Sequence, residues 1–402
     1  MESKSILDQI ISNLSAEEVA KLNAPEILNN LFSELNERER DILTRRFGLR
    51  GKEKETLENI GGAHKLTRER IRQIEIAAIK KLRDLENLEN YISGLKKIII
   101  QLLEEHGGFA ERNYLLDILV NFSADGNRAS EEEKNVHKSY LDFLISKLLR
   151  EEFEEIGDSE IFKNSVKFKH QTLEHLEKLA RELVGKIQEA KKVFTTAELI
   201  SLARESESFK NNKDKFDTSN NIDISGHLGN ITPEEAEIIN INKALYSILR
   251  AHKHVEQNKF GQWGLRDWRE ISPKTINDKI YLVLKKEGRP MHFVEIAEKI
   301  NVTGFDDKRA NAATVHNELI LDEKYILVGR GLYGLKEWGY KSGTVADIIA
   351  EILESAPASM GKDEITEKVM DQRMVKKATI VLALMNKEKF EKTADGKYRF
   401  KN

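Results

Sequence analysis

Side chains suited to reading DNA bases cluster within six residues of this chain: Arg68, Glu69, Arg72 and Gln73. Arg fits the edge of guanine, Gln that of adenine, and Glu accepts from the cytosine amine. The surrounding run, Thr56 to Arg83, predicts two short helices joined by a tight turn, with Thr67 as N-cap of the second. A helix-turn-helix presents the first turns of its second helix to the major groove, which is where these side chains fall.

The same second helix must pack on a core to hold that face outward. Apolar residues recur at steps of three and four after the cap, at Ile71, Ile74, Ala78 and Leu82. Seven basic and two acidic residues between Lys65 and Arg83 make a local basic patch in a chain of net charge −3. Candidates for phosphate contact are Arg45, Arg46, Lys65, Thr67, Arg70 and Lys80.

The run from Leu31 to Arg83 resembles region four of primary bacterial sigma factors, most specifically in its RERIRQ motif. That family binds the −35 promoter element and docks on the flap of the RNA polymerase β subunit. The resemblance implies that the four base-reading candidates make the promoter contacts, and that double-stranded promoter DNA and the RNA polymerase core are partners. Gly62 departs from a position that is usually basic, and His64 from one that is usually a core aromatic.

Other sigma regions are not recognisable in the sequence. No segment resembles the aromatic, basic helix that melts the −10 element, nor the other core-binding regions. The region-four likeness covers about an eighth of the chain. We therefore expect a protein that is not a self-sufficient initiation factor.

Length and composition limit the kinds of structure and site that the rest of the chain can form. The 402 residues predict several domains, since single cores rarely grow beyond about 250 residues. The absence of cysteine excludes disulfides and thiolate metal sites. The sequence has no apolar run of about 18 residues and no signal-peptide core at MESKSILDQI, so we expect a cytoplasmic protein with no membrane partner. The resemblance to sigma factors implies that it is bacterial and nucleoid-associated.

Past residue 90 the chain repeats one theme: three helices followed by two apolar strands around a turn, which is the winged-helix plan. Thr275 to Trp338 shows it most clearly, with Gly288 and Pro290 ending its first helix. Ile320 is assigned to the buried face of its third helix. The hairpin of the first unit is expected within residues 151–163, and Asp395-Gly396 is the expected hairpin turn of the last unit. In the preceding unit the last helix is expected over Ile238 to His252, and the polar stretch Ser206 to Thr232 favours a flexible insertion.

Thr275 to Trp338 also resembles the HARE-type helix-turn-helix family, through GRPMHFVEIAEKI at its start and YILVGRGLYGLKEW at its end. Bacterial members of that family include the delta subunit of RNA polymerase. The family is associated with transcription and with DNA-modifying systems, through DNA or protein contacts. The sequence leaves open which kind of contact applies here.

The predicted fold class is mainly α: a sigma-region-four-like helix-turn-helix followed by tandem winged-helix units with small β-hairpin wings. The predicted domains are an N-terminal helical extension (1–30), the helix-turn-helix (31–88), an acidic winged unit (91–169), a winged unit with a polar insertion at 206–232 (171–268), the HARE-type unit (272–340) and a C-terminal winged unit (343–402). Candidates for DNA contact in the last two units lie on their expected third helices, at Lys308, Arg309, Asn311, Asn317, Lys376 and Lys377, and at the expected wing tip, at Arg330.

Signals for other chemistry are weak. Gly329 to Gly334 formally matches GxGxxG, but no helix can open on its last glycine, so a wing turn is the better interpretation. His252 and His254 lack the further ligands that a metal site needs. No nucleophile constellation can be read out. We expect no enzyme, metal, cofactor or small-molecule substrate.

Two classes of function remain. In the first, the protein is a sequence-specific DNA-binding transcription factor that reads a −35-like element and acts with RNA polymerase in transcription initiation or its regulation. In the second, it is an RNA polymerase-associated, delta-like subunit whose modules bind mainly protein. Acidic runs such as Glu151 to Glu155 favour the second locally, because they repel phosphate.

Overall fold

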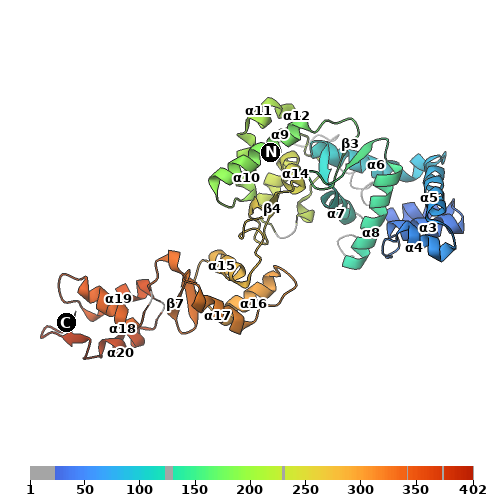
Figure 1. Cartoon of the computed structure of the whole chain (residues 1–402). Helices are drawn as coiled ribbons and strands as arrows, with labels where there is room; N and C mark the ends of the chain where they lie inside the picture. The colour runs from blue at the N-terminus through green and yellow to red at the C-terminus, as the bar shows by residue number, and fades with distance from the viewer. Residues whose placement is uncertain (1–22, 123–129, 229–230, 342, 374, 402) are drawn as a thin grey trace. The chain divides into compact units, whose positions relative to one another are not determined.

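The computed structural model describes residues 23–122, 130–228, 231–341, 343–373 and 375–401. Most of the predicted N-terminal extension (1–30) lies outside these residues. The chain divides into two compact units, the first reaching Arg266 and the second running from Asp267 onward together with 258–260 (Figure 1). None of the described helices has the length and apolar content needed to cross a membrane.

The first unit opens with a helical module whose ends are set by side-chain caps. Its helices are α2 (Ala24–Ser33), α3 (Glu37–Phe47), α4 (Leu57–His64) and α5 (Arg68–Arg83). Asn36 and Glu39 form a capping box at the start of α3, and Gly48, in the left-handed conformation, ends that helix. Thr56 and Thr67 accept hydrogen bonds at the starts of α4 and α5.

Four later segments share one order of elements, and we call them the first to fourth winged units. The first (88–168) contains α6 (Leu88–Glu105), β1 (Phe109–Glu111), α7 (Arg112–Phe122), α8 (Glu131–Phe143) continued by the turn η1 (Leu144–Leu148), β2 (Phe153–Ile156) and β3 (Ser165–Phe168). The second (174–265) contains α9 (Glu174–Ala190), α10 (Thr196–Arg204), α11 (Glu207–Asn211), α12 (Lys213–Phe216), η2 (Ser225–His227), α13 (Pro233–Ile241), α14 (Lys243–Ala251), β4 (Val255–Gln257) and β5 (Trp263–Leu265).

The last two winged units belong to the second compact unit. The third (276–338) contains α15 (Ile276–Glu287), β6 (Met291–His292), α16 (Phe293–Thr303), α17 (Ala312–Leu321), β7 (Tyr325–Gly329), β8 (Leu332–Leu335) and η3 (Lys336–Trp338). The fourth (345–400) contains α18 (Val345–Glu354), α19 (Lys362–Gln372), α20 (Lys377–Leu384), β9 (Phe390–Lys392) and β10 (Tyr398–Phe400). Each has a hydrophobic core of its own.

The sheets show the same topology in each winged unit. A short strand after the first helix pairs with the last strand, giving the antiparallel orders β1-β3-β2 and β6-β8-β7. In the second and fourth units that first strand shrinks to single bridges, Phe194 with Trp263 and Met360 with Tyr398. This added strand fixes the hairpin against the helices, and the sequence pattern of three helices and a hairpin did not predict it.

The predicted fold class, mainly α with small β-hairpin wings, is confirmed. The expected turn at Asp395-Gly396 joins β9 to β10, with Gly396 at φ +84°. The domain boundaries themselves stay a prediction.

The segment 206–232 was expected to be a flexible insertion, and that expectation is wrong for its described residues. Phe209, Phe216 and Ile224 are buried, and α11, α12 and η2 lie within the segment. Its many Ser, Asn and Asp residues act as local caps, as when Ser206 accepts from the amide of Phe209. The mainly polar composition of this segment made its few buried apolar residues hard to recognise in the sequence.

Three smaller expectations also differ from the structure. The helix expected over Ile238 to His252 breaks at Asn242, whose side chain donates to the Ile238 carbonyl. Ile320, assigned to a buried face, is 61% exposed. The hairpin expected within 151–163 uses a later second strand, β3, because Phe162 pairs instead with His252 of the second winged unit.

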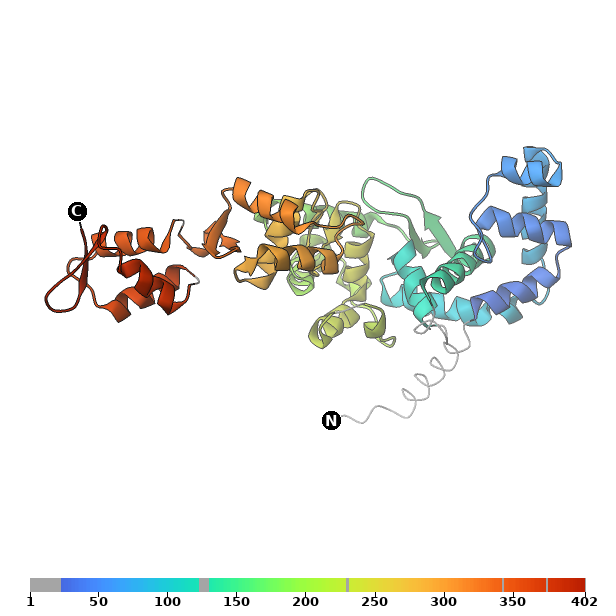
Figure 2. The same cartoon turned by 90° about the horizontal axis from the view of Figure 1, so that it is seen from below.

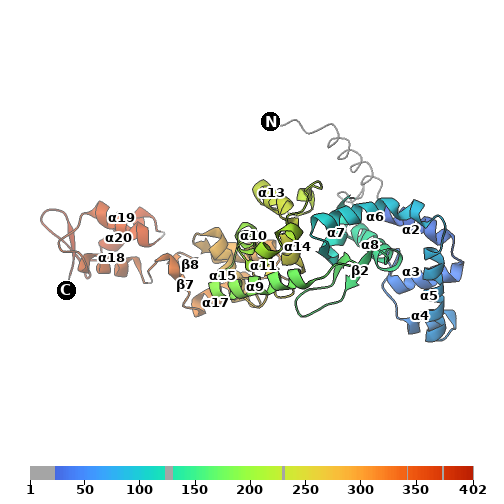
Figure 3. The same ribbon diagram turned by 90° about the horizontal axis from the view of Figure 1, so that it is seen from above.

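The third helix of the first winged unit packs against the N-terminal module. Helix α2 contacts α6 and α8, and the blue module lies beside the cyan winged unit in Figures 2 and 3. The Phe143 ring meets Phe32 and Phe47 edge-on at centroid distances of 5.9 and 5.0 Å. Arg83 Nε donates to the Lys147 carbonyl at 2.6 Å. The exposed first turn of α8 carries glutamates, at 131–133.

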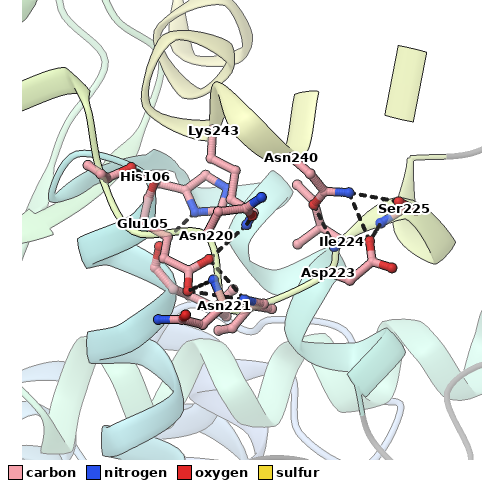
Figure 4. A network of polar contacts seen from close by, with 12 residues as sticks. Glu105, His106, Asn220, Asn221, Asp223, Ile224, Ser225, Asn240 and Lys243 are labelled. Carbon is pink, nitrogen blue, oxygen red and sulfur yellow. Dashed lines mark hydrogen bonds and ion pairs between the residues drawn. The ribbon is translucent and has the colours of Figure 1, made fainter. Parts of the chain in front are cut away.

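The third helix of the second winged unit, α14, is covered as well. Its residues are buried except Arg250, and it packs against β1 of the first winged unit. Lys243, 1% exposed, donates to Glu105 Oε2 at 2.7 Å and to Asn220 Oδ1 at 2.6 Å (Figure 4). Glu105 also accepts from the amides of Asn221 and Ile222. This buried network joins the first two winged units.

Candidate nucleic-acid interface

The turn between α4 and α5 is tight for identifiable reasons. An added Cβ on Gly61 would lie 2.7 Å from the Leu66 carbonyl oxygen, so only glycine fits there. The Leu66 amide donates to the Gly61 carbonyl at 2.9 Å, and Lys65 adopts the left-handed conformation at φ +55°. Thr67 Oγ1 then accepts from the Arg70 amide and starts α5, as the sequence predicted.

The buried face of α5 is the one that the apolar spacing predicted. Ile71 packs with Ile42 and Ile60 in one core, Ile74 lies at its edge, and Ala78 and Leu82 are buried further along the helix. The base-reading candidates project from the other side of the helix, and all of them are exposed: Arg68, Glu69, Arg72 and Gln73.

Glu69 holds the guanidinium of Arg72 through two hydrogen bonds, from Nε at 2.8 Å and from Nη2 at 2.7 Å. The hydrogen bond from Arg72 lowers the pKa of the Glu69 carboxyl and raises that of Arg72. A guanidinium has five N–H donors, so Nη1 and the second hydrogen of Nη2 stay available at its tip. That end of the fork matches the O6 and N7 atoms of guanine.

A second pair lies beside the first. Arg70 Nη1 donates to Gln73 Oε1 at 3.2 Å. Reading adenine uses both the oxygen and the nitrogen of the Gln amide. The amide oxygen has two lone pairs, so Gln73 can accept from Arg70 and still engage a base. Arg70 thereby orients the Gln73 amide and keeps its other N–H groups available for a phosphate.

The phosphate candidates fall into two groups. Lys65, Thr67, Arg70 and Lys80 are exposed. Arg45 instead pairs with Asp41 at 2.8 Å and Glu55 at 3.2 Å, and Arg46 lies 3.5 Å from Glu75. Burial alone would raise the pKa of Asp41, but hydrogen bonds from Arg45 and His64 bring it below its ordinary value. Arg45 and Arg46 therefore hold α3 to its surroundings in this structure.

The two departures from the sigma pattern have different consequences. An added Cβ on Gly62 would meet no atom within 4 Å, so the glycine removes a side chain without being required by packing. His64 is half-buried, and its Nε2 lies 2.9 Å from Asp41 Oδ2. A polar tether from α4 to α3 thus stands at this position.

Comparison with known families identifies two segments. Residues 31–84 match the model of sigma-70, region 4. Residues 274–338 match the model of the HARE-type helix-turn-helix, a domain of ASXL proteins and restriction endonucleases. The two resemblances predicted from the sequence are confirmed, and the first segment is a sigma-related helix-turn-helix of a DNA-binding kind.

The curated relatives are similar over the same region. RNA polymerase sigma factor SigA1 of Synechococcus elongatus is 51% identical over 67 residues, 17% of each chain. Sigma factor SigA of Synechocystis is 49% identical over 67 residues, 17% of this chain and 16% of the relative. Sigma factor RpoS of Coxiella burnetii is 36% identical over 89 residues, 21% of this chain and 25% of the relative. The chain thus spans a quarter or less of these relatives, and no solved structure matches it.

The candidates of the third winged unit lie in three places: the loop before α17, α17 itself and the tip of the hairpin. Lys308 and Arg309 are exposed in the loop before α17, not on the helix where the sequence placed them. Asn311 caps the helix by accepting from the Ala313 amide at 2.8 Å. Asn317 is exposed on α17, and Arg330 is exposed at the tip of the β7–β8 hairpin.

The candidates of the fourth winged unit start its third helix. Lys376 is the N-cap residue of α20 and Lys377 its first residue, and both are exposed. Further basic residues of this unit, Lys387, Lys392 and Lys401, were not predicted and are exposed on the hairpin side. The sequence did contain a signal for these lysines, since the segment from Arg373 to Lys401 has nine basic and only three acidic residues.

The sequence features that could have indicated a nucleotide or metal site have structural roles instead. Gly329 ends β7 and Gly331 lies in the hairpin turn at φ +70°, as expected of a wing. The ring of His252 is buried, and its Nδ1 accepts from the amides of His254 and Val255. Burial lowers the pKa of His252 to about 4. The described residues contain no group of three potential metal ligands.

Proposed function

We propose that this protein is a non-enzymatic, sequence-specific DNA-binding transcription factor of the bacterial cytoplasm that reads a −35-like promoter element. The observation that carries the proposal is the exposed first half of α5, where four base-reading side chains lie opposite a buried apolar face. The similarity to sigma factors supports DNA and RNA polymerase as partners. We further propose the β-subunit flap as the docking point on the polymerase.

Each side chain has a proposed role. Arg72, held by Glu69, contacts a guanine, Gln73 contacts an adenine, and Arg68 and Glu69 complete the readout. Lys65, Thr67, Arg70 and Lys80 contact phosphates, and Arg45 and Arg46 support them at longer range. In the third winged unit, the loop residues Lys308 and Arg309, with Asn311, Asn317 and Arg330, extend the DNA footprint.

The test is an Arg72→Ala substitution, measured by fluorescence anisotropy on a duplex that carries a −35 element. Loss of a base contact should weaken binding by about 1–3 kcal/mol and relax specificity at one position. Arg181→Ala is the matched control, since Arg181 is also exposed and pairs with a glutamate of its own helix. Equal losses in the two variants, or none in either, would contradict base reading by α5.

A second candidate is the RNA polymerase-associated subunit that works mainly through protein contacts. It is favoured by one observation: in the first two winged units, the C-terminal half of the third helix α8 and nearly all of the third helix α14 are covered by other parts of the chain. The candidates differ in salt dependence. DNA binding that displaces several counterions weakens steeply as salt rises, whereas a flat profile on duplex DNA favours the protein-binding subunit.

A further inference from the structure

The fourth winged unit contains a groove between the end of its third helix and its hairpin. The groove has a volume of ≈ 570 Å³, within the ~300–1,000 Å³ of sites that bury a drug-sized group. Leu384 and Phe390 line its floor, and Tyr398 and Met385 line its walls. Leu384 and Phe390 are each only 4% exposed, whereas Met385 is 66% exposed.

The apolar surface continues out of the groove along α20. Leu382, 67% exposed, lies one helical turn before Met385 on the same side of the helix. Thr379 extends this exposed stripe toward the start of α20. A helix that reads bases presents Arg, Asn or Gln, whereas this stripe presents thioether and alkyl groups. The composition of the stripe therefore favours a protein partner over a DNA groove.

The rim of the groove is positively charged. Lys387, Lys392 and Lys401 line it, and no ion pair among the described residues includes any of these three lysines. Of the other charges nearby, Lys389 pairs with Asp347, and Arg399 pairs with Glu391, an acid that also lines the groove. Glu388 is exposed beside Lys387 and is in no ion pair among the described residues, but the three lysines outnumber it, so the net unmatched charge around the apolar floor is basic.

We propose that this groove binds an acidic, amphipathic segment of another protein. Apolar side chains at helical spacing would enter between α20 and the hairpin, as in other helix-in-groove complexes. Carboxylates on the flanks of the same segment would meet the three lysines, which favours acidic partners and speeds their association. The inference does not depend on promoter reading by α5.

The test uses the full-length protein and a labelled 16-residue peptide with Leu and Phe at positions i, i+3, i+4 and i+7 and Asp or Glu elsewhere. Fluorescence anisotropy should show binding that weakens with added salt. A peptide of the same composition, with its apolar residues at every second position, should bind much less. The triple change Lys387→Glu, Lys392→Glu and Lys401→Glu should weaken binding about tenfold, because it replaces attraction of the peptide carboxylates by repulsion at three points of the rim.

Two further variants test the contribution of the apolar groove separately from that of the charged rim. Met385→Asp should also weaken peptide binding, and its exposure leaves the core of the unit intact. Lys362→Glu, an exposed lysine at the start of α19, is the matched control and should bind the peptide like the unaltered protein. The Arg72→Ala variant should also bind the peptide normally. Failure of this test can therefore be told apart from failure of the promoter-reading test.

Three outcomes overturn the proposal. One is absence of binding by the amphipathic peptide, and another is equal affinity in the unaltered protein and the triple variant. The third is a triple variant that loses affinity for a 20-base-pair duplex of arbitrary sequence while the peptide binds as before. In that case the lysines bind phosphates, and the groove does not select acidic segments.

Discussion

The first two and the last two winged units share one order of elements and one sheet topology, yet their third helices have opposite surroundings. Helix α14 is buried almost throughout, and the C-terminal half of α8 packs on the N-terminal module. Helices α17 and α20 instead show exposed side chains such as Asn317 and Leu382. In a winged helix the third helix is the usual reader of DNA, so a shared topology here does not imply a shared role.

The contrast separates a supporting region from a binding region. In the first compact unit, α14 and the C-terminal half of α8 help to build a scaffold, whereas the first half of α5 keeps its side chains exposed. Among the described residues of the second compact unit, α17, α20 and both hairpins carry exposed side chains. If the proposed function holds, four winged units need not form four DNA-binding surfaces.

The largest effect that would test this contrast concerns the buried ion pair of the scaffold. Glu105→Ala leaves the ammonium of Lys243, 1% exposed, without its carboxylate. An uncompensated buried charge should lower the free energy of unfolding by about 3–5 kcal/mol. Chemical denaturation measures the loss, and hydrogen exchange in α6 and α14 locates it.

The matched control lies in the fourth winged unit. Glu391→Ala removes an ion pair with Arg399 that is largely exposed on both sides, so the loss should be about 0–1 kcal/mol. If the two substitutions destabilise the protein equally, the scaffold does not depend on the buried pair.

A second prediction compares one apolar side chain from each kind of third helix. Phe143→Ala empties the contact with Phe32 and Phe47 and should cost about 3–5 kcal/mol of stability. Leu382→Ala removes a side chain that is 67% exposed and should change stability by no more than about 0.5 kcal/mol. Thermal unfolding of both variants measures the difference. A Phe143→Ala protein with unchanged stability would show that α8 is not fixed on the N-terminal module.

The sequence predicted local features well and long-range packing poorly. The cap at Thr67, the turn at Gly61 to Thr67 and the outward direction of Arg72 all follow from spacing within one helix. Pairing between Glu105 and Lys243 joins residues 138 positions apart, and no local pattern specifies it. The helical pattern gave no warning either: Lys243, Ser247 and Arg250 form one polar face of α14, which is the pattern of a half-exposed helix.

The same reasoning explains the errors in 206–232 and at Lys308 and Arg309. Composition averaged over a long polar stretch hid Phe209 and Phe216, whose burial is decided by neighbouring helices. The boundary of α17 was placed too early because Asn311, a good N-cap, was counted as a residue of the helix. Both errors arise where tertiary contacts or caps outweigh average propensity.

The last prediction uses pH to separate the two regions. Burial lowers the pKa of His106 and of His252, both in the first compact unit, to about 4. His106 Nδ1 donates to the Leu102 carbonyl, and its Nε2 accepts from the Tyr114 hydroxyl, so the folded state holds the neutral ring. The unfolded chain protonates near pH 6.5, so the stability from these rings is complete above that pH and decreases as the pH falls toward 4.

At pH 5 each ring should therefore have lost about 2 kcal/mol of stabilisation relative to neutral pH. The described residues of the second compact unit include no buried histidine, so its amides should keep their protection over the same range. Hydrogen exchange at pH 7 and pH 5, corrected for the intrinsic rate, should show faster opening in α6 and α14 but not in α15 or α18. Both rings belong to the packing that covers the third helices. If the amides of the two regions lost protection from exchange in parallel, the scaffold would not be a separate, acid-sensitive body.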